Sequence, residues 1–115
     1  MARSHKPVVW SLFAAGGTFA AFITPVMIFV TGLAIAFGLL PADALAYERV
    51  LAAVQNPIAK GLVFLTVFFP VWHAAHRLRI TAHDFGIRAD TVVLTICYGL
   101  AALATIVTLM TLFNL

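Results

Sequence analysis

The sequence predicts an all-α membrane protein with three transmembrane helices. Of its 115 residues, 63% are hydrophobic and only 10% are charged, whereas soluble domains carry about 25% charged residues. Three long apolar stretches account for this composition, so we expect residues 1–115 to form a single membrane domain. The seven Lys and Arg residues are scattered, which excludes a nucleic-acid binder. A single cysteine excludes a disulfide framework and a four-cysteine metal site.

The first apolar stretch has no charged residue from Pro7 to Ala42. It is longer than the roughly 20 residues that cross a bilayer, and too short for two spans and a turn. We expect one long helix over about residues 8–40, kinked at Pro25 and ended by Pro41. A cleaved secretory signal is the alternative, but the apolar core of such a signal has only about 7–15 residues.

A short amphipathic segment, residues 43–55, follows the first span. Its apolar residues recur at helical spacing, and Asp43 is placed to cap its start. Tyr47 belongs to the residue types that lie at headgroup depth. The segment therefore predicts a short helix on the outer membrane surface.

The second and third spans are expected over about residues 57–77 and 91–115. Asn56 is a suitable cap for the second span, and Pro57 suits its first turn. Asp90 is placed to cap the third span.

The positive charges indicate how the chain is oriented, because cations are enriched on the cytoplasmic side of membrane proteins. The N-terminal segment and the loop between the second and third spans hold most of them: Arg3, Lys6, Arg77, Arg79 and Arg88. Only Arg49 and Lys60 belong to the other side. We therefore expect a cytoplasmic N-terminus and a periplasmic C-terminus.

Residues able to support chemistry gather at the cytoplasmic end of the second span. On a helix, Trp72 and His76 are neighbours four residues apart, as are His73 and Arg77. His76, Arg79 and His83 also follow one another at steps of three and four, so they share one stripe of the helix. Trp10 enters the first span at the same membrane boundary. Aromatic walls with imidazole and guanidinium donors suit the flat ring and carbonyl oxygens of a quinone. The alternative is an ordinary interfacial belt of aromatic and basic side chains.

Two other kinds of membrane protein fit the sequence poorly. A proton-coupled carrier needs an acidic group within the membrane, but no predicted span contains one in its interior. A haem needs two axial ligands, and most of the histidines lie at the end of one helix and its extension: His73, His76 and His83. The chain cannot hold a haem alone, although it could share one with a partner subunit.

Taken in order, a set of short stretches resembles the fumarate reductase D subunit family. The resemblance covers nearly the whole chain. The matching stretches are Val9-Trp10, Leu12-Phe13, Ala15-Gly16-Gly17, Pro25-Val26, Asp43-Ala44-Leu45, Tyr47-Glu48-Arg49-Val50-Leu51, Pro70 with Trp72, His76-Arg77, His83-Asp84 and Tyr98-Gly99-Leu100-Ala101.

The resemblance implies a membrane anchor in the bacterial inner membrane, not itself catalytic, within a four-subunit complex. Its partners would be a second hydrophobic anchor, a flavoprotein with FAD and an iron–sulfur subunit, and anchors of this type lack haem. Menaquinol would deliver electrons for fumarate reduction in anaerobic respiration. By motif, Trp10, His76 and Arg77 are expected to bind the quinone, and His73 and Trp72 to support them.

This sequence departs from the family pattern at the cytoplasmic rim. His5 and Lys6 stand where acidic residues are usual, and Arg79 and Ile80 replace a usual pair of histidines. Two alternatives remain: an anchor of succinate dehydrogenase that shares a haem b, and a free-standing small membrane protein with an assembly or carrier role.

Overall fold

The computed structural model describes residues 6–115, and this part of the chain is helical without any strand. Its helices are α1 (Lys6–Ile28), α2 (Tyr47–Gln55), α3 (Pro57–Asp84) and α4 (Asp90–Asn114), and a π-helical segment, η1 (Phe29–Leu33), extends α1. Three helical stretches are long and apolar enough to cross a membrane: Trp10–Leu33, Pro57–Asp84 and Asp90–Asn114. The predicted fold class of three apolar spans is therefore confirmed. Arg3, one of the cations used for the orientation, lies outside the described residues.

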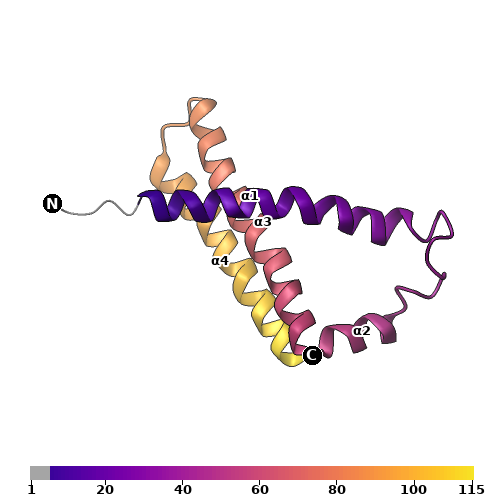
Figure 1. The fold of residues 1–115 in the computed structure, drawn as a ribbon. Coiled ribbons are helices and arrows are strands. Elements are labelled where there is room, and N and C mark those ends of the chain that lie inside the picture. Colours follow the sequence, from indigo (N-terminus) through magenta and orange to yellow (C-terminus); the bar gives the residue numbers. More distant parts are fainter. Residues whose placement is uncertain (1–5) are drawn as a thin grey trace.

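Helix α3 is the centre of the fold. It packs along α4 as an antiparallel hairpin, and it also contacts α1 and α2. Figure 1 shows α1 crossing the hairpin at a steep angle, while α2 lies beside the start of α3. The three long helices therefore form a crossed arrangement, in which only the N-terminal half of α1 lies over the hairpin.

The first helical stretch ends earlier than the expected Leu40. Pro25 lies inside α1, and the α-helical pattern gives way to the π-helical segment η1 from Phe29. The chain then closes on Gly38, whose φ of +69° suits glycine. Leu39 N–H donates to Ala34 C=O and Gly38 N–H to Ile35 C=O, the two bonds of a Schellman motif. Gly38, and not Pro41, therefore ends the stretch.

The predicted cap of α3 is confirmed. The Asn56 side-chain oxygen accepts hydrogen bonds from the backbone N–H groups of Ile58 at 2.9 Å and Ala59 at 3.4 Å. Pro57 occupies the first helical position, where its missing N–H costs nothing.

The predicted caps Asp43 and Asp90 are wrong. Helices α2 and α4 begin after Ala46 and Ala89, and neither start has a side-chain cap. Both carboxylates are engaged elsewhere: Asp43 forms a 2.7 Å ion pair with Arg49, and Asp90 binds side chains of α3. The surface helix begins at Tyr47 and not at residue 43.

Helix α3 continues past the expected end at Arg77 to Asp84. Gly86, with a φ of +78°, then ends it in a second Schellman motif. Ile87 N–H donates to Ala82 C=O and Gly86 N–H to His83 C=O. The extra two turns carry Arg79 and His83 on the same helix as His76.

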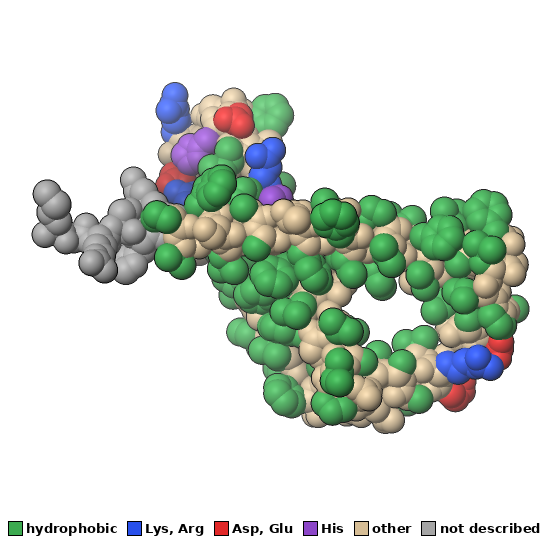
Figure 2. Space-filling view, viewed as in Figure 1, with side chains coloured by type: hydrophobic (Ala, Val, Ile, Leu, Met, Phe, Trp, Pro, Cys, Tyr) green, Lys and Arg blue, Asp and Glu red, His purple; other side chains and the backbone are tan. Residues whose placement is uncertain are grey.

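Little of the described chain is buried. The only apolar side chains that are buried among residues 6–115 are Ala34, Ala75, Ala101 and Leu112. Figure 2 shows hydrophobic side chains over the helices and charged ones gathered near the α3–α4 turn and around α2. An opening is visible between the later part of α1, the loop that follows it, α2 and the start of α3. This exposure suits helices that lie in a membrane.

Close packing of α1 on α3 depends on two adjacent glycines. A Cβ on Gly16 would lie 3.2 Å from the Phe69 carbonyl oxygen, and one on Gly17 would lie 2.5 Å from His73 Cε1. Small residues allow such approach between membrane helices. The small-residue face around Gly16 and Gly17 therefore packs within this chain, whereas a Cβ on Gly32 would meet nothing within 4 Å.

Candidate functional site

A cavity of about 270 Å³ lies where α1 crosses α3 beside α4. Its walls come from all three long helices and are mainly aromatic. The lining residues are Leu12, Phe13, Phe68, Phe69, Trp72, His73, His76 and Tyr98. The cavity thus combines flat apolar walls with two imidazoles from successive turns of α3.

His73 is held against α1. Its ring lies parallel to that of Phe13, with centroids 4.4 Å apart and an interplanar angle of 9°. His73 Nδ1 lies 3.2 Å from the Phe13 carbonyl oxygen. A carbonyl oxygen can only accept, so this hydrogen bond places a hydrogen on Nδ1.

His76 lies one turn further along α3 and faces both neighbouring helices. Its ring centroid is 4.5 Å from that of Phe13, with the planes tilted by 58°. Its Nδ1 shares a 2.7 Å hydrogen bond with the hydroxyl of Tyr98 on α4. The imidazole is therefore fixed from two sides.

Trp72 forms the wall next to α4. Its indole Nε1–H donates to Thr105 Oγ1 at 3.0 Å. Its ring is stacked on that of Tyr98, with centroids 6.0 Å apart and an interplanar angle of 26°. Because the indole N–H is hydrogen-bonded to α4, Trp72 presents only the apolar part of its ring to the cavity.

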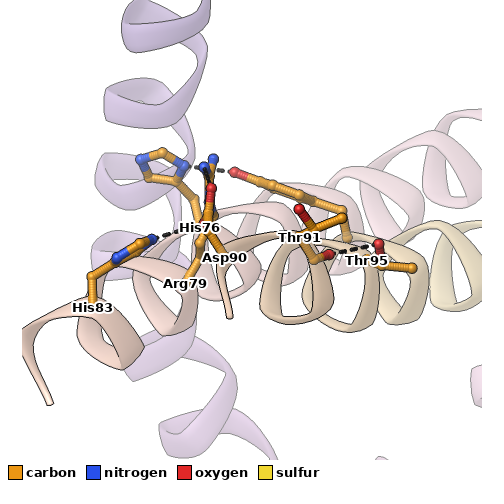
Figure 3. A network of polar contacts seen from close by, with 7 residues as sticks. His76, Arg79, His83, Asp90, Thr91 and Thr95 are labelled. Atoms are coloured by element: carbon orange, nitrogen blue, oxygen red, sulfur yellow. Dashed lines mark hydrogen bonds and ion pairs between the residues drawn. The ribbon is translucent and has the colours of Figure 1, made fainter. Parts of the chain in front are cut away.

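A polar cluster continues from the cavity towards the α3–α4 turn (Figure 3). Arg79 donates two hydrogen bonds to Asp90, from Nε at 2.9 Å and from the terminal nitrogen at 2.8 Å. His83 Nε2 lies 2.8 Å from the same carboxylate, on Asp90 Oδ1. The bidentate geometry joins the last turns of α3 to the first turn of α4.

The predicted stripe on α3 thus faces α4. Trp72, His76, Arg79 and His83 each contact a residue of α4. The spacing of the sequence predicted their common face, and the contacts show which helix that face meets.

The structure brings together only part of the predicted quinone site. His76 lines the cavity, as do the two expected supporting residues His73 and Trp72. Trp10 and Arg77 do not line it, and both side chains are exposed, Trp10 at 70%. Trp10 lies three residues before Phe13, and Phe13 is the residue of the pair that lines the cavity.

Two important site residues, Phe13 and Tyr98, were not among the predicted site residues. Phe13 follows Trp10 by one helical turn, so it shares the same end of α1. Tyr98 is the only tyrosine within the three apolar spans, since Tyr47 belongs to α2. A lone hydroxyl-bearing aromatic residue inside an apolar helix is a signal that pointed to this site.

These residues suit a flat, apolar ligand with carbonyl oxygens. The aromatic rings offer stacking surfaces, and the imidazoles offer the polar groups within the wall that can donate, accept or carry a proton. Among residues 6–115, no three His, Cys, Asp or Glu side chains gather as a metal site.

Comparison with known proteins places the chain in a family. The family model for the fumarate reductase D subunit matches residues 1–113. The chain belongs to the fumarate reductase D subunit family. The D subunit of Vibrio vulnificus fumarate reductase is 38% identical over 113 residues, which cover 98% of this chain and 90% of that relative. The D subunit from Photobacterium profundum is 43% identical over 103 residues, covering 90% of this chain and 86% of that relative. The resemblance seen in the sequence is confirmed, and the chain is a multi-pass membrane protein of this family.

Proposed function

We propose that the chain anchors a four-subunit fumarate reductase in the bacterial inner membrane and helps to form its menaquinol site. Family membership and three apolar helices support the anchoring role. The chain is almost entirely helix of membrane-spanning length, so FAD and the iron–sulfur clusters would lie in partner subunits. Those partners would be a flavoprotein, an iron–sulfur subunit and the second hydrophobic anchor.

One observation carries the menaquinol part of the proposal: His76 lines a cavity whose other walls are mostly aromatic rings. The residues fit a quinone ring, because the cavity is flat-walled and apolar and its polar groups lie at defined places. A bound menaquinol supplies two electrons and two protons for anaerobic electron transport. His76 would hydrogen-bond a ring oxygen of the quinone, a task suited to an imidazole N–H.

Trp10 and Arg77 take a different place in this proposal. Both side chains are exposed, and they stand at the same ends of α1 and α3 as the cavity residues Phe13 and His76. We expect them to complete the site from outside the cavity, where partner subunits would meet this chain. A guanidinium there would donate to a quinone oxygen or to a partner carboxylate.

The orientation is also part of the proposal. The cations near the N-terminus and around the α3–α4 turn support a cytoplasmic placement of the cavity end. The soluble subunits would then meet the side of the membrane where His76 and Arg79 lie, and the C-terminus would be periplasmic.

The test uses the complex purified through a tag on this chain in mild detergent. Two large soluble subunits with flavin and iron–sulfur absorption, and without haem bands, are the expected result. Haem bands would instead identify an anchor of succinate dehydrogenase, and recovery of the chain alone would identify a free-standing membrane protein.

The quinone role is tested by His76→Leu in the same complex. Quinol-driven fumarate reduction should slow by at least about tenfold, the effect of losing roughly one hydrogen bond to the ligand. Viologen-driven reduction, which bypasses the membrane site, measures assembly. Thr111→Leu is the matched control, since Thr111 is exposed near the other end of α4. An unchanged quinol-driven rate in His76→Leu would refute the quinone role.

A further inference from the structure

We propose that Tyr98 decides which nitrogen of His76 carries the hydrogen, and thereby makes Nε2–H of His76 the donor that the cavity offers to a quinone oxygen. This inference rests on the proposed quinone site and deepens it. Tyr98 is a positioning residue in this scheme, because it acts through His76.

The geometry begins with a single short contact. The Tyr98 hydroxyl and His76 Nδ1 lie 2.7 Å apart, and both residues line the cavity. A neutral imidazole carries one hydrogen, so one nitrogen donates and the other accepts. Either direction is possible for this bond considered alone.

The surroundings of the Tyr98 hydroxyl remove the ambiguity. Among residues 6–115, this hydroxyl forms a side-chain hydrogen bond with His76 Nδ1 alone, so its hydrogen has an acceptor only at that nitrogen. The opposite direction would leave the Tyr98 hydrogen without a partner in an apolar surrounding, which is costly.

Arg79 places a fixed positive charge in the same polar cluster as His76 (Figure 3). Two hydrogen bonds to Asp90 hold its guanidinium, and His83 binds the same carboxylate. A doubly protonated His76 would add a second cation to this cluster, which Coulomb repulsion disfavours. His76 is therefore favoured with one hydrogen, and Tyr98 decides which nitrogen carries it.

His73 provides the contrast within the same cavity. Its Nδ1 donates to the Phe13 carbonyl, so its Nε2 carries no hydrogen in the neutral ring. That nitrogen lies close to Gly17, 3.3 Å from where a Cβ would stand. The two histidines therefore hold opposite tautomers, and His76 is the one that presents an N–H for a ligand.

The first measurement is equilibrium binding of a short-chain naphthoquinone to the purified complex by titration calorimetry. Tyr98→Phe should raise the Kd about fivefold, because the hydrogen of His76 is then free to move to Nδ1. Tyr47→Phe is the matched control, since Tyr47 lies on α2 and is 72% exposed. An unchanged Kd in Tyr98→Phe would overturn the inference.

A second measurement identifies the nitrogen. A glutamine amide nitrogen reaches roughly where imidazole Nε2 lies, and an asparagine nitrogen roughly where Nδ1 lies. His76→Gln should therefore retain tighter naphthoquinone binding than His76→Asn. Adding Tyr98→Phe to His76→Gln should change the Kd less than about twofold, because the hydroxyl then has no tautomer to select. The inference would be overturned if His76→Gln and His76→Asn had equal Kd values. It would also be overturned if Tyr98→Phe raised the Kd of the His76→Gln variant by the same factor as it raises that of the wild type.

The same titrations separate this inference from the proposed function. If His76→Leu leaves the Kd at its wild-type value, the quinone site itself is wrong. If His76→Leu weakens binding but Tyr98→Phe does not, only the role of Tyr98 is wrong.

Discussion

The ring of Phe13 in α1 lies parallel to the ring of His73 in α3, with centroids 4.4 Å apart. The backbone carbonyl of Phe13 also accepts a hydrogen bond from His73 Nδ1 at 3.2 Å. One residue of α1 therefore holds the imidazole through both its ring and its backbone. This contact joins the packing of α1 to the placement of the candidate site.

The space that His73 occupies depends on Gly17. A Cβ at Gly17 would stand 2.5 Å from His73 Cε1 and 2.9 Å from its Nδ1, distances that no packed side chain maintains. Gly17→Ala should therefore push α1 from α3, lower the thermal midpoint of the complex and slow quinol-driven fumarate reduction.

Gly99→Ala is the control for this substitution, because a Cβ on Gly99 of α4 would meet nothing within 4 Å. Alanine favours helix over glycine by about 1 kcal/mol, so Gly99→Ala should leave the midpoint equal or raise it. Equal midpoints for Gly17→Ala and wild type would contradict the tight α1–α3 contact.

The hydrogen bond from Trp72 to Thr105 joins α3 to α4 within the apolar span. Thr105→Val should destabilise the complex by about 1 kcal/mol, because the indole N–H loses its acceptor. Once Trp72→Phe has removed the donor, Thr105→Val should lower the free energy of unfolding by much less. A double-mutant cycle in denaturant-induced unfolding measures this coupling.

Thr111→Val is the control for the cycle, since the Thr111 hydroxyl is exposed and bonds only the Val107 carbonyl of its own helix. It should show no coupling to Trp72→Phe. Additive effects of Thr105→Val and Trp72→Phe would mean that the bond contributes nothing to stability.

The sequence predicted the helices well because their signals are local. Long uncharged stretches identified the three spans, and the Asn-Pro pair identified the start of α3. The helix ends were less predictable. The first stretch and α3 end at Gly38 and Gly86, which adopt left-handed conformations, whereas the sequence predicted these ends at a proline and at a charged residue. Asp43 and Asp90 were misjudged as caps, because the partners that engage them are side chains at a distance along the chain.

The candidate site was predictable only along single helices. Spacing placed His76, Arg79 and His83 on one face of α3, and the structure confirms that they share it. Spacing carries no information on the angle at which α1 crosses α3, so it could not show that Phe13, and not Trp10, reaches the cavity. Tyr98 lies on another helix, and its contact with His76 is tertiary.

The Arg79–Asp90 pair should contribute more to stability than an ordinary surface ion pair. Its geometry is bidentate and its side chains are 27% and 41% exposed, whereas those of the Arg49–Asp43 pair are 60% and 59% exposed. Asp90→Asn should therefore lower the thermal midpoint of the complex more than Asp43→Asn does. Raising the salt concentration should reduce the effect of Asp43→Asn before that of Asp90→Asn, because exposed ion pairs are screened more strongly. Equal shifts for the two variants would show that the bidentate geometry adds nothing.

Arg77 offers a prediction about the exposed edge of the site. Its side chain is exposed, and among residues 6–115 it has no ion-pair partner. Its charge is therefore free to act on a ligand or a partner subunit. Arg77→Leu should slow quinol-driven fumarate reduction and leave the viologen-driven rate per flavin unchanged, since the loss concerns the membrane site alone. Arg88→Leu, the same change of charge in the α3–α4 turn, should slow quinol-driven reduction less. Equal loss of both activities in Arg77→Leu would show instead that Arg77 serves assembly of the complex.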